Sequence, residues 1–308
     1  MNPDRPQRPD RRDFMRLAGG LALAGVFPPL AAAEAMRRRA IPSSGEAVPV
    51  VGLGTAHQFD VAGDPEVLAS LKEVLLRLFE GGGTVIDTSP MYGRAEAVLG
   101  QLMSTTDLPA RPFLATKVWT RGRDEGIRQM KQSMSLMGTD TVDLMQVHNL
   151  VDWRVHMETL RDWKEEGTIR YTGITHYRTD AFDDLETVMR EARPDWVQLN
   201  YSILTPAAEQ RLLPLARELG IAVMVNRPYE RGEVFGRVRG RDLPEIAREL
   251  ECATWGQFFL KWVLGHPAVT CAIPGTSNPR HVADNVQAGF GPLPDAGQRA
   301  RMREAIGA

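Results

Sequence analysis

Residues 84–96 read Thr84-Val85-Ile86-Asp87-Thr88-Ser89-Pro90-Met91-Tyr92-Gly93-Arg94-Ala95-Glu96, a β-branched run followed by a polar loop. The run ends at the carboxylate of Asp87, and a proline turn separates it from Tyr92 and Gly93. This order predicts a buried strand, a tight connection and the start of a helix. Asp87 and Tyr92 would then lie at one mouth of a sheet. Because a tyrosine with a pKa near ~10 is a weak acid, it needs a neighbouring cation to become a usable proton donor.

Eight short runs rich in Val, Ile and Thr alternate with longer amphipathic segments. The runs are 48–55, 84–88, 113–118, 141–148, 169–175, 196–200, 221–226 and 269–273. The segments predicted to be helical are 65–80, 95–103, 124–137, 152–165, 181–191, 206–219, 243–252 with 254–264, and 280–288. Apolar strands alternating with helices indicate a parallel sheet covered on both faces. Eight such units predict an α/β fold, a closed (β/α)8 TIM barrel.

The alternative is an open doubly wound sheet. It is disfavoured because no GxGxxG motif follows an early strand. Proline and glycine are spread among the loops and form no linker, so residues 36–308 are predicted to be one domain. A length of 308 residues would suit two domains of ~150 residues, but α/β barrels often reach this size as one.

Composition narrows the function classes. The formal net charge of −2 gives no basic excess that would indicate a nucleic-acid partner. The two cysteines, Cys252 and Cys271, lack the spacing of a zinc site and are predicted to be buried, unreactive thiols. No His/Cys/Asp spacing suggests a metal, and none is expected.

The first 35 residues differ from the rest. Arg11 and Arg12 precede Phe14, a mildly apolar run covers 17–27, and small residues fill 31–35. This pattern resembles a twin-arginine export signal with its cleavage region. It predicts the twin-arginine export machinery as a partner and a periplasmic or extracytoplasmic location, or a cytoplasmic one if the signal does not function. A basic disordered tail or a short membrane anchor is the alternative, although the run is shorter than the ~20 residues that a stable span needs.

The active site of a barrel lies at the carboxyl ends of its strands. Those ends are, in chain order, Thr55, Asp87, Lys117, His148, Thr175-His176, Gln198, Asn226-Arg227 and Gly275-Thr276. Lys117 supplies the cation that Tyr92 needs, and Asp87 can pair with it. A neighbouring ammonium is expected to lower a tyrosine pKa by ~1–3 units. The same cluster could instead be a structural ion network at the barrel rim.

Several of these segments resemble the aldo-keto reductase family. Asp87-Thr88-Ser89 with Tyr92-Gly93 and Glu96, Ala115-Thr116-Lys117, and Gln146-Val147-His148-Asn149 are similar to its catalytic segments. Further similar segments are Val51-Gly52-Leu53-Gly54-Thr55, Gln198-Leu199-Asn200-Tyr201-Ser202, and Ile273-Pro274-Gly275-Thr276-Ser277-Asn278-Pro279 ending at Asn285. The segments follow the family order over nearly all of the chain after residue 50.

The resemblance implies hydride transfer between a nicotinamide cofactor and a carbonyl or alcohol. Tyr92 would be the general acid in reduction and the general base in oxidation. Lys117, held by Asp87, would depress the pKa of Tyr92. His148 would hydrogen-bond the substrate oxygen, and the substrate would be a small aldehyde, ketone or alcohol.

The resemblance also implies a set of cofactor-binding residues. They are Thr55, Asp87, Thr175, His176, Gln198, Arg227, Thr276, Ser277, Arg280 and Asn285. The chain departs from the family at Asn226, where an aromatic often stacks on nicotinamide, and at Gly275 and His281, where Lys and Arg are usual. We expect NADPH, with NADH left open, and Arg227 is a candidate for the pyrophosphate.

The second hypothesis is a non-catalytic nicotinamide-nucleotide-binding sensor or auxiliary subunit on the same barrel. The set Asp87, Tyr92, Lys117 and His148 favours an enzyme, since a binding module has no need of all four. His57, Trp119 and Trp153 could line the substrate mouth or simply pack, and the residues leave this open. The protein is expected to be a monomer.

Overall fold

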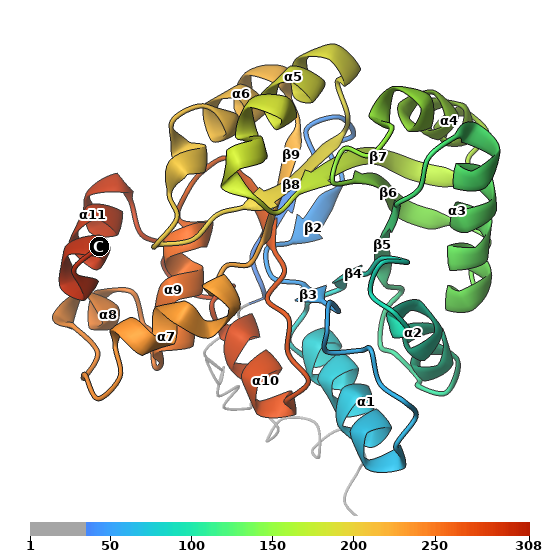
Figure 1. The fold of residues 1–308 in the computed structure, drawn as a ribbon. Coiled ribbons are helices and arrows are strands. Elements are labelled where there is room, and N and C mark those ends of the chain that lie inside the picture. The colour runs from blue at the N-terminus through green and yellow to red at the C-terminus, as the bar shows by residue number, and fades with distance from the viewer. Residues whose placement is uncertain (1–34) are drawn as a thin grey trace, which may run out of the picture. The chain divides into compact units, whose positions relative to one another are not determined.

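The computed structural model describes residues 35–308, which belong to one compact unit (Figure 1). Eight parallel strands lie side by side in chain order. They are β3 (Leu53–Gly54), β4 (Val85–Asp87), β5 (Phe113–Val118), β6 (Val142–His148), β7 (Ile169–His176), β8 (Trp196–Asn200), β9 (Ala222–Asn226) and β10 (Val269–Ala272). Parallel bridges from Val51 to Ala272 and from Gly54 to Gly275 join the two edges of the sheet. The predicted (β/α)8 barrel is therefore confirmed.

Helices surround the strands (Figure 1). They are α1 (Pro65–Glu80), α2 (Ala95–Ser104), α3 (Arg123–Met137), α4 (Trp153–Glu165), α5 (Phe182–Ala192), α6 (Leu212–Leu219), α7 (Glu233–Arg237), α8 (Glu245–Glu249), α9 (Trp255–Leu264), α10 (Pro279–Gln287) and α11 (Ala296–Ile306). The Asp64 side chain caps α1 with Pro65 in its first turn, and Gly138 ends α3 in the left-handed conformation. Local capping chemistry therefore sets the ends of these helices.

The run 48–55, predicted as one strand, is divided in the structure. Its first part is β2 (Ala47–Pro49), which pairs antiparallel with β1 (Arg38–Ala40), and β3 begins only at Leu53. Ile41 and Val48 of this hairpin pack in the cluster of inward-facing strand residues that includes Val85 and Trp196. The hairpin thus covers one end of the barrel, a tertiary contact that a local apolar run cannot reveal.

Three consecutive arginines stand at this hairpin: Arg37 and Arg38 are exposed, whereas Arg39 is half-buried. The Arg39 guanidinium donates to the carbonyls of Leu264, His266 and Val269 next to β10. Burial is the main cause that lowers the Arg39 pKa to about 10, and Arg37 adds to it. The hydrogen bonds of Arg39 therefore attach the β1–β2 hairpin to the end of the barrel.

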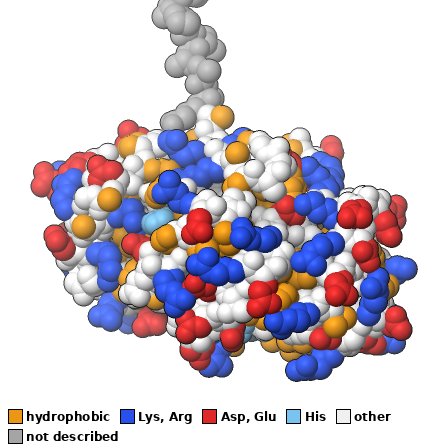
Figure 2. Space-filling view, turned by 90° about the horizontal axis from the view of Figure 1, so that it is seen from above, with side chains coloured by type: hydrophobic (Ala, Val, Ile, Leu, Met, Phe, Trp, Pro, Cys, Tyr) orange, Lys and Arg blue, Asp and Glu red, His pale blue; other side chains and the backbone are white. Residues whose placement is uncertain are grey.

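Residues 1–34, where the predicted export signal lies, fall outside the described part, so the signal and its cleavage region stay predictions. Within residues 35–308, no helix has the length and apolar character needed to cross a bilayer. Figure 2 shows cationic and anionic side chains interspersed over one face of the molecule. Such mixing gives no single-signed surface on that face.

The contact of α2 with α3 provides a test of the packing. A Cβ added at Gly100 would lie 2.0 Å from the Leu136 carbonyl oxygen, which belongs to the backbone and cannot rotate away. We expect Gly100→Ala to lower the free energy of unfolding by about 1–3 kcal/mol in urea denaturation, the usual cost of overpacking. Gly236→Ala, in α7 with open space around it, is the control and should leave stability unchanged or raise it by up to about 1 kcal/mol. Equal stability of the two variants would contradict the close approach of α2 to α3.

Candidate active site

A polar layer lies above the apolar layer inside the barrel. Side chains two residues apart on a strand share a face, so the residue two positions after each inward apolar one points into the same interior. Val85 is followed by Asp87, Ala115 by Lys117, Leu144 by Gln146 and Trp196 by Gln198. The switch from apolar to polar at these positions places the chemistry at the carboxyl ends of the strands.

Lys117 and Asp87 form a buried ion pair at the centre of this layer. The Lys117 Nζ lies 2.7 Å from the Asp87 Oδ2 and donates to the Thr88 carbonyl at 2.7 Å, and the lysine side chain is fully buried. The amides of Gln146 and Gln198 both donate to the Asp87 Oδ1, each at 2.9 Å. Burial alone would lower the Lys117 pKa, but Asp87 and then Tyr92 raise it above its ordinary value. Lys117 is therefore held as a cation.

The predicted cation does reach Tyr92. The Lys117 Nζ lies 4.9 Å from the centroid of the Tyr92 ring, and the His148 ring meets it edge-on at 5.8 Å. The pKa of Tyr92 is nevertheless raised, because burial outweighs the lowering by Lys117. The expectation of a depressed pKa is thus wrong for the chain alone: the sequence locates the cation but does not reveal how strongly the phenol is desolvated. Tyr92 is held as a neutral proton donor at physiological pH.

His148 is neutral and oriented. Burial, followed by the charge of Lys117, lowers its pKa to about 2. Its Nδ1 lies 2.9 Å from the Ser89 Oγ, and the Trp119 ring lies 6.4 Å away. A neutral imidazole carries one donor and one acceptor nitrogen, so it can donate a single hydrogen bond to a substrate oxygen.

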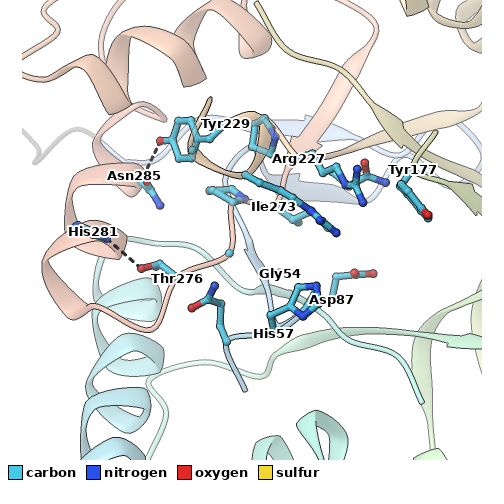
Figure 3. A pocket seen from close by; sticks show the side chains of 18 of the residues that line it. Gly54, His57, Asp87, Tyr177, Arg227, Tyr229, Ile273, Thr276, His281 and Asn285 are labelled. Atoms are coloured by element: carbon cyan, nitrogen blue, oxygen red, sulfur yellow. Dashed lines mark hydrogen bonds between the residues drawn. The ribbon is translucent and has the colours of Figure 1, made fainter. Parts of the chain in front are cut away.

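These residues open onto a cavity of about 1070 Å³. That volume exceeds the ~300–1,000 Å³ typical of a small-molecule pocket, which leaves room for a long ligand and a substrate together. Figure 3 shows that it extends from Asp87 to Thr276 and Asn285, with Arg227 and Tyr177 on one wall. Of the predicted site residues, the structure places Asp87, Tyr92, His148, Thr175, Gln198, Arg227, Thr276 and Asn285 on its lining.

Five predicted residues are not on the lining. The side chain of Thr55 donates to the Asp87 carbonyl, and Lys117 lies beneath Tyr92. The Ser277 carbonyl accepts from the Ser70 hydroxyl, and the Arg280 backbone N–H is capped by Asn278. The His176 Nδ1 accepts from the Arg178 N–H while its ring stacks on Tyr177.

The structure places all three residues whose role at the mouth the sequence left open. His57 lines the cavity, whereas Trp119 is not among the lining residues and is 41% exposed beside His148. Trp153 is half-buried and packs against the hydrophobic core, with the Arg154 guanidinium 4.2 Å from its ring centroid. Cys252 and Cys271 are free and buried, as predicted.

Several polar side chains that hydrogen-bond to or lie beneath the site residues were not predicted from the sequence. Gln146 donates to Asp87 and belongs to the quoted segment Gln146-Val147-His148. Because Gln146 and His148 are two residues apart on β6, their side chains share a face, and this spacing could have indicated that Gln146 belongs to the site. The Asn226 Nδ2 donates to the Gln198 Oε1 at 3.3 Å, and its Oδ1 is buried with no hydrogen-bond partner among the described residues. Glu96 is buried beneath the site and accepts from Thr116 and Ser133.

The loop after β9 carries two arginines into the cavity. Arg227 and Arg231 both line it, and neither forms an ion pair within residues 35–308. The Arg227 guanidinium lies 4.0 Å from the Tyr177 ring centroid, while Glu230 turns away toward Ser202. Burial and then the charge of Arg231 lower the Arg227 pKa. Arg227, Glu230 and Arg231 have positive φ angles of 50, 45 and 54°, so the loop holds an unusual backbone shape that brings two cations together.

The far end of the cavity is formed by α10 and the loop that precedes it. The Thr276 Oγ1 lies 3.3 Å from the His281 Nδ1, and the Tyr229 hydroxyl donates to the Asn285 Oδ1 at 2.6 Å (Figure 3). Gly275 makes close contact with the Gly54 carbonyl, 2.9 Å from where a Cβ would lie. A lysine side chain at position 275 would therefore require a shift of β3. Among the described residues, no three His, Cys, Asp or Glu side chains converge as a metal ion would need.

The family model described as "Aldo/keto reductase family" matches residues 50–305. The chain therefore belongs to the aldo/keto reductase family. Aldo-keto reductase str7 of Strobilurus tenacellus is 26% identical over 256 residues, which are 70% of this chain and 75% of that protein.

Solved structures agree with this assignment. A Klebsiella pneumoniae aldo/keto reductase in complex with NADP and acetate is 26% identical with a TM-score of 0.71, covering 85% of this chain and 93% of that one. A second Klebsiella pneumoniae structure, in complex with NADPH, is 25% identical with a TM-score of 0.71, covering 89% and 96%. A chain of this family is an oxidoreductase.

Proposed function

We propose that this protein is an NADPH-dependent reductase of small aldehydes or ketones, with Tyr92 as the proton donor. The observation that carries the proposal is the neutral, half-buried Tyr92 phenol beside the Lys117–Asp87 pair in the cavity. A protein that only bound the nucleotide would have no need to place a lysine, an aspartate and a proton donor together. NADP-bound relatives support the choice of cofactor.

The residues present fit a nicotinamide nucleotide. The unpaired Asn226 Oδ1 on β9 is an acceptor for a carboxamide N–H, and Thr175 and the Nε2 of His176 lie on β7, with β8 between the two strands. Thr276 in the loop before α10 and Asn285 in the last turn of α10 would hold the adenosine end, with Ser277 and Arg280 near Thr276 in sequence. When bound, the cofactor supplies the hydride.

The chain's own residues position the carbonyl and supply the proton. His148 donates a hydrogen bond to the carbonyl oxygen and orients it. Tyr92 gives its phenolic proton to the same oxygen as negative charge develops there. Lys117 stabilises the phenolate that remains, and Asp87 keeps the lysine in place. In the reverse direction the phenolate accepts the alcohol proton.

Arg227 and Arg231 are proposed to hold the cofactor pyrophosphate. Two cations without carboxylate partners in one cavity repel each other, and an anion between them would relieve this. We expect Arg227→Met to raise the NADPH Kd by about 10- to 150-fold, since a charge-assisted hydrogen bond contributes ~1.5–3 kcal/mol. Its Kd should also respond less to added salt. Fluorescence titration measures both; the exposed Arg178→Met, whose partner is Asp180, is the control, and an unchanged Kd for Arg227→Met would contradict the proposal.

The function is tested with the full chain, NADPH and a panel of aldehydes, ketones and diones, with product alcohol identified by mass spectrometry. Turnover with NADPH consumption supports the reductase. Tight NADPH binding without turnover on any member of the panel would favour the sensor or auxiliary subunit instead. Running the panel with NADH as well compares the two kcat/KM values, and a clear NADH preference would refute the choice of NADPH.

A further inference from the structure

Ser89 stands between the catalytic tyrosine segment and His148. Its side chain is fully buried, and its Oγ lies 2.9 Å from the His148 Nδ1. It also accepts the Met91 backbone N–H at 3.1 Å. Since Pro90 has no N–H, Met91 offers the first backbone donor after Ser89.

The donors and acceptors around Ser89 can be paired in one satisfactory way. The Met91 N–H occupies one lone pair of the Oγ, which leaves the hydroxyl hydrogen in need of an acceptor. Among the described residues the His148 Nδ1 is the acceptor within reach. If Nδ1 carried the proton instead, a fully buried hydroxyl hydrogen would have no partner, which native structures avoid.

We propose that Ser89 is a positioning residue that keeps His148 in the tautomer with its proton on Nε2. The Nε2 makes no hydrogen bond to any residue of the described chain, and His148 lines the cavity. In this tautomer the ring presents a donor to the carbonyl oxygen. In the other tautomer it would present a lone pair, which repels that oxygen.

The charges around His148 agree with a neutral ring. Lys117 and Tyr92 face it from β5 and from the loop after β4, His176 faces it from β7, and Trp119 lies beside it. Lys117 and His176 both oppose a second proton on the ring. The tautomer is therefore decided by the hydrogen bond at Nδ1 and not by a neighbouring carboxylate.

The tautomer can be read directly by long-range proton–nitrogen NMR of the full chain labelled with ¹⁵N-histidine. His148→Gln assigns the signals. We expect wild type at neutral pH to show a protonated Nε2 and a bare Nδ1. Ser89→Ala should show a mixture or the opposite tautomer, while Ser89→Thr, which keeps the hydroxyl, should restore the wild-type pattern. Ser133→Ala, which removes another buried hydroxyl that donates to Glu96, is the control and should leave the pattern unchanged.

The kinetic effect rests on the proposed reductase function. With a carbonyl substrate, Ser89→Ala should lower kcat about tenfold, the effect of one net hydrogen bond, with an unchanged NADPH Kd. A wild-type spectrum with the proton on Nδ1, or a Ser89→Ala variant with wild-type tautomer and wild-type kcat, would overturn the proposal. If the spectra are as expected but wild type reduces no carbonyl, the tautomer assignment stands and the reductase function fails.

Discussion

Lys117→Met is expected to lower the free energy of unfolding by about 3–5 kcal/mol, because it leaves Asp87 charged and buried without its partner. The Asp87 Oδ2 would lose a hydrogen bond of 2.7 Å to a lysine that is fully buried. Turnover should fall sharply as well, since Lys117 is the main charge that stabilises a Tyr92 phenolate and Arg227 contributes less. Urea denaturation measures the first effect and NADPH consumption the second.

A second variant separates stability from catalysis. Asp87→Asn combined with Lys117→Met removes both charges, so it should recover part of the lost stability without recovering turnover. Arg154→Met is the control, since Arg154 pairs with Glu191 on the surface where both side chains are about half exposed or more. An exposed pair contributes only ~0–1 kcal/mol. If Lys117→Met cost no more than this control, the ion pair would not hold the site together.

The local pattern of apolar and polar residues was enough to predict the barrel and the position of most of its helices. The alternation of apolar runs with amphipathic segments reflects the burial of strands and of one helix face that the structure shows. The predicted helix 65–80 has the same limits as α1. The division of 48–55 could not be predicted. Val48 and Leu53 are equally apolar, and only the barrel end that the hairpin covers distinguishes them. Helix α11 was missed because its apolar positions are few and its capping box at Asp295 lies after the last predicted strand unit.

The site residues at the ends of strands could be predicted from the sequence, whereas those in loops could not. Asp87, Lys117 and His148 follow apolar runs directly, so the topology alone brings them together. The arginine pair depends on three left-handed residues in one loop, and no residue-level rule predicts that backbone. The pKa of Tyr92 was predicted in the wrong direction, because burial is a property of the assembled cavity and the sequence displays only the charges.

Tyr92→Phe is expected to lower kcat by about 10²–10⁴-fold, the usual contribution of a positioned general acid. The ring remains, so its contacts with Lys117 and His148 should persist, and the NADPH Kd should stay unchanged. Tyr171→Phe is the control, because it removes a phenol hydroxyl among the apolar inward-facing residues, bonded there to Ser44 and Glu46. Equal rates for wild type and Tyr92→Phe, with both still binding NADPH, would contradict the role of Tyr92.

The pH dependence gives the same assignment an independent check. A proton donor acts in its protonated form, which is populated below its pKa, and burial raises the pKa of Tyr92 above its ordinary value. Carbonyl reduction by wild type should therefore be level from neutral pH upward and decline only above about pH 10. Alcohol oxidation needs the phenolate, so its rate should rise with pH over the same interval. The phenylalanine side chain has no ionisable proton, so Tyr92→Phe should show neither the decline of reduction nor the rise of oxidation with pH. A reduction rate that already falls between about pH 7 and 9 would mean that Lys117 outweighs burial once cofactor and substrate are bound.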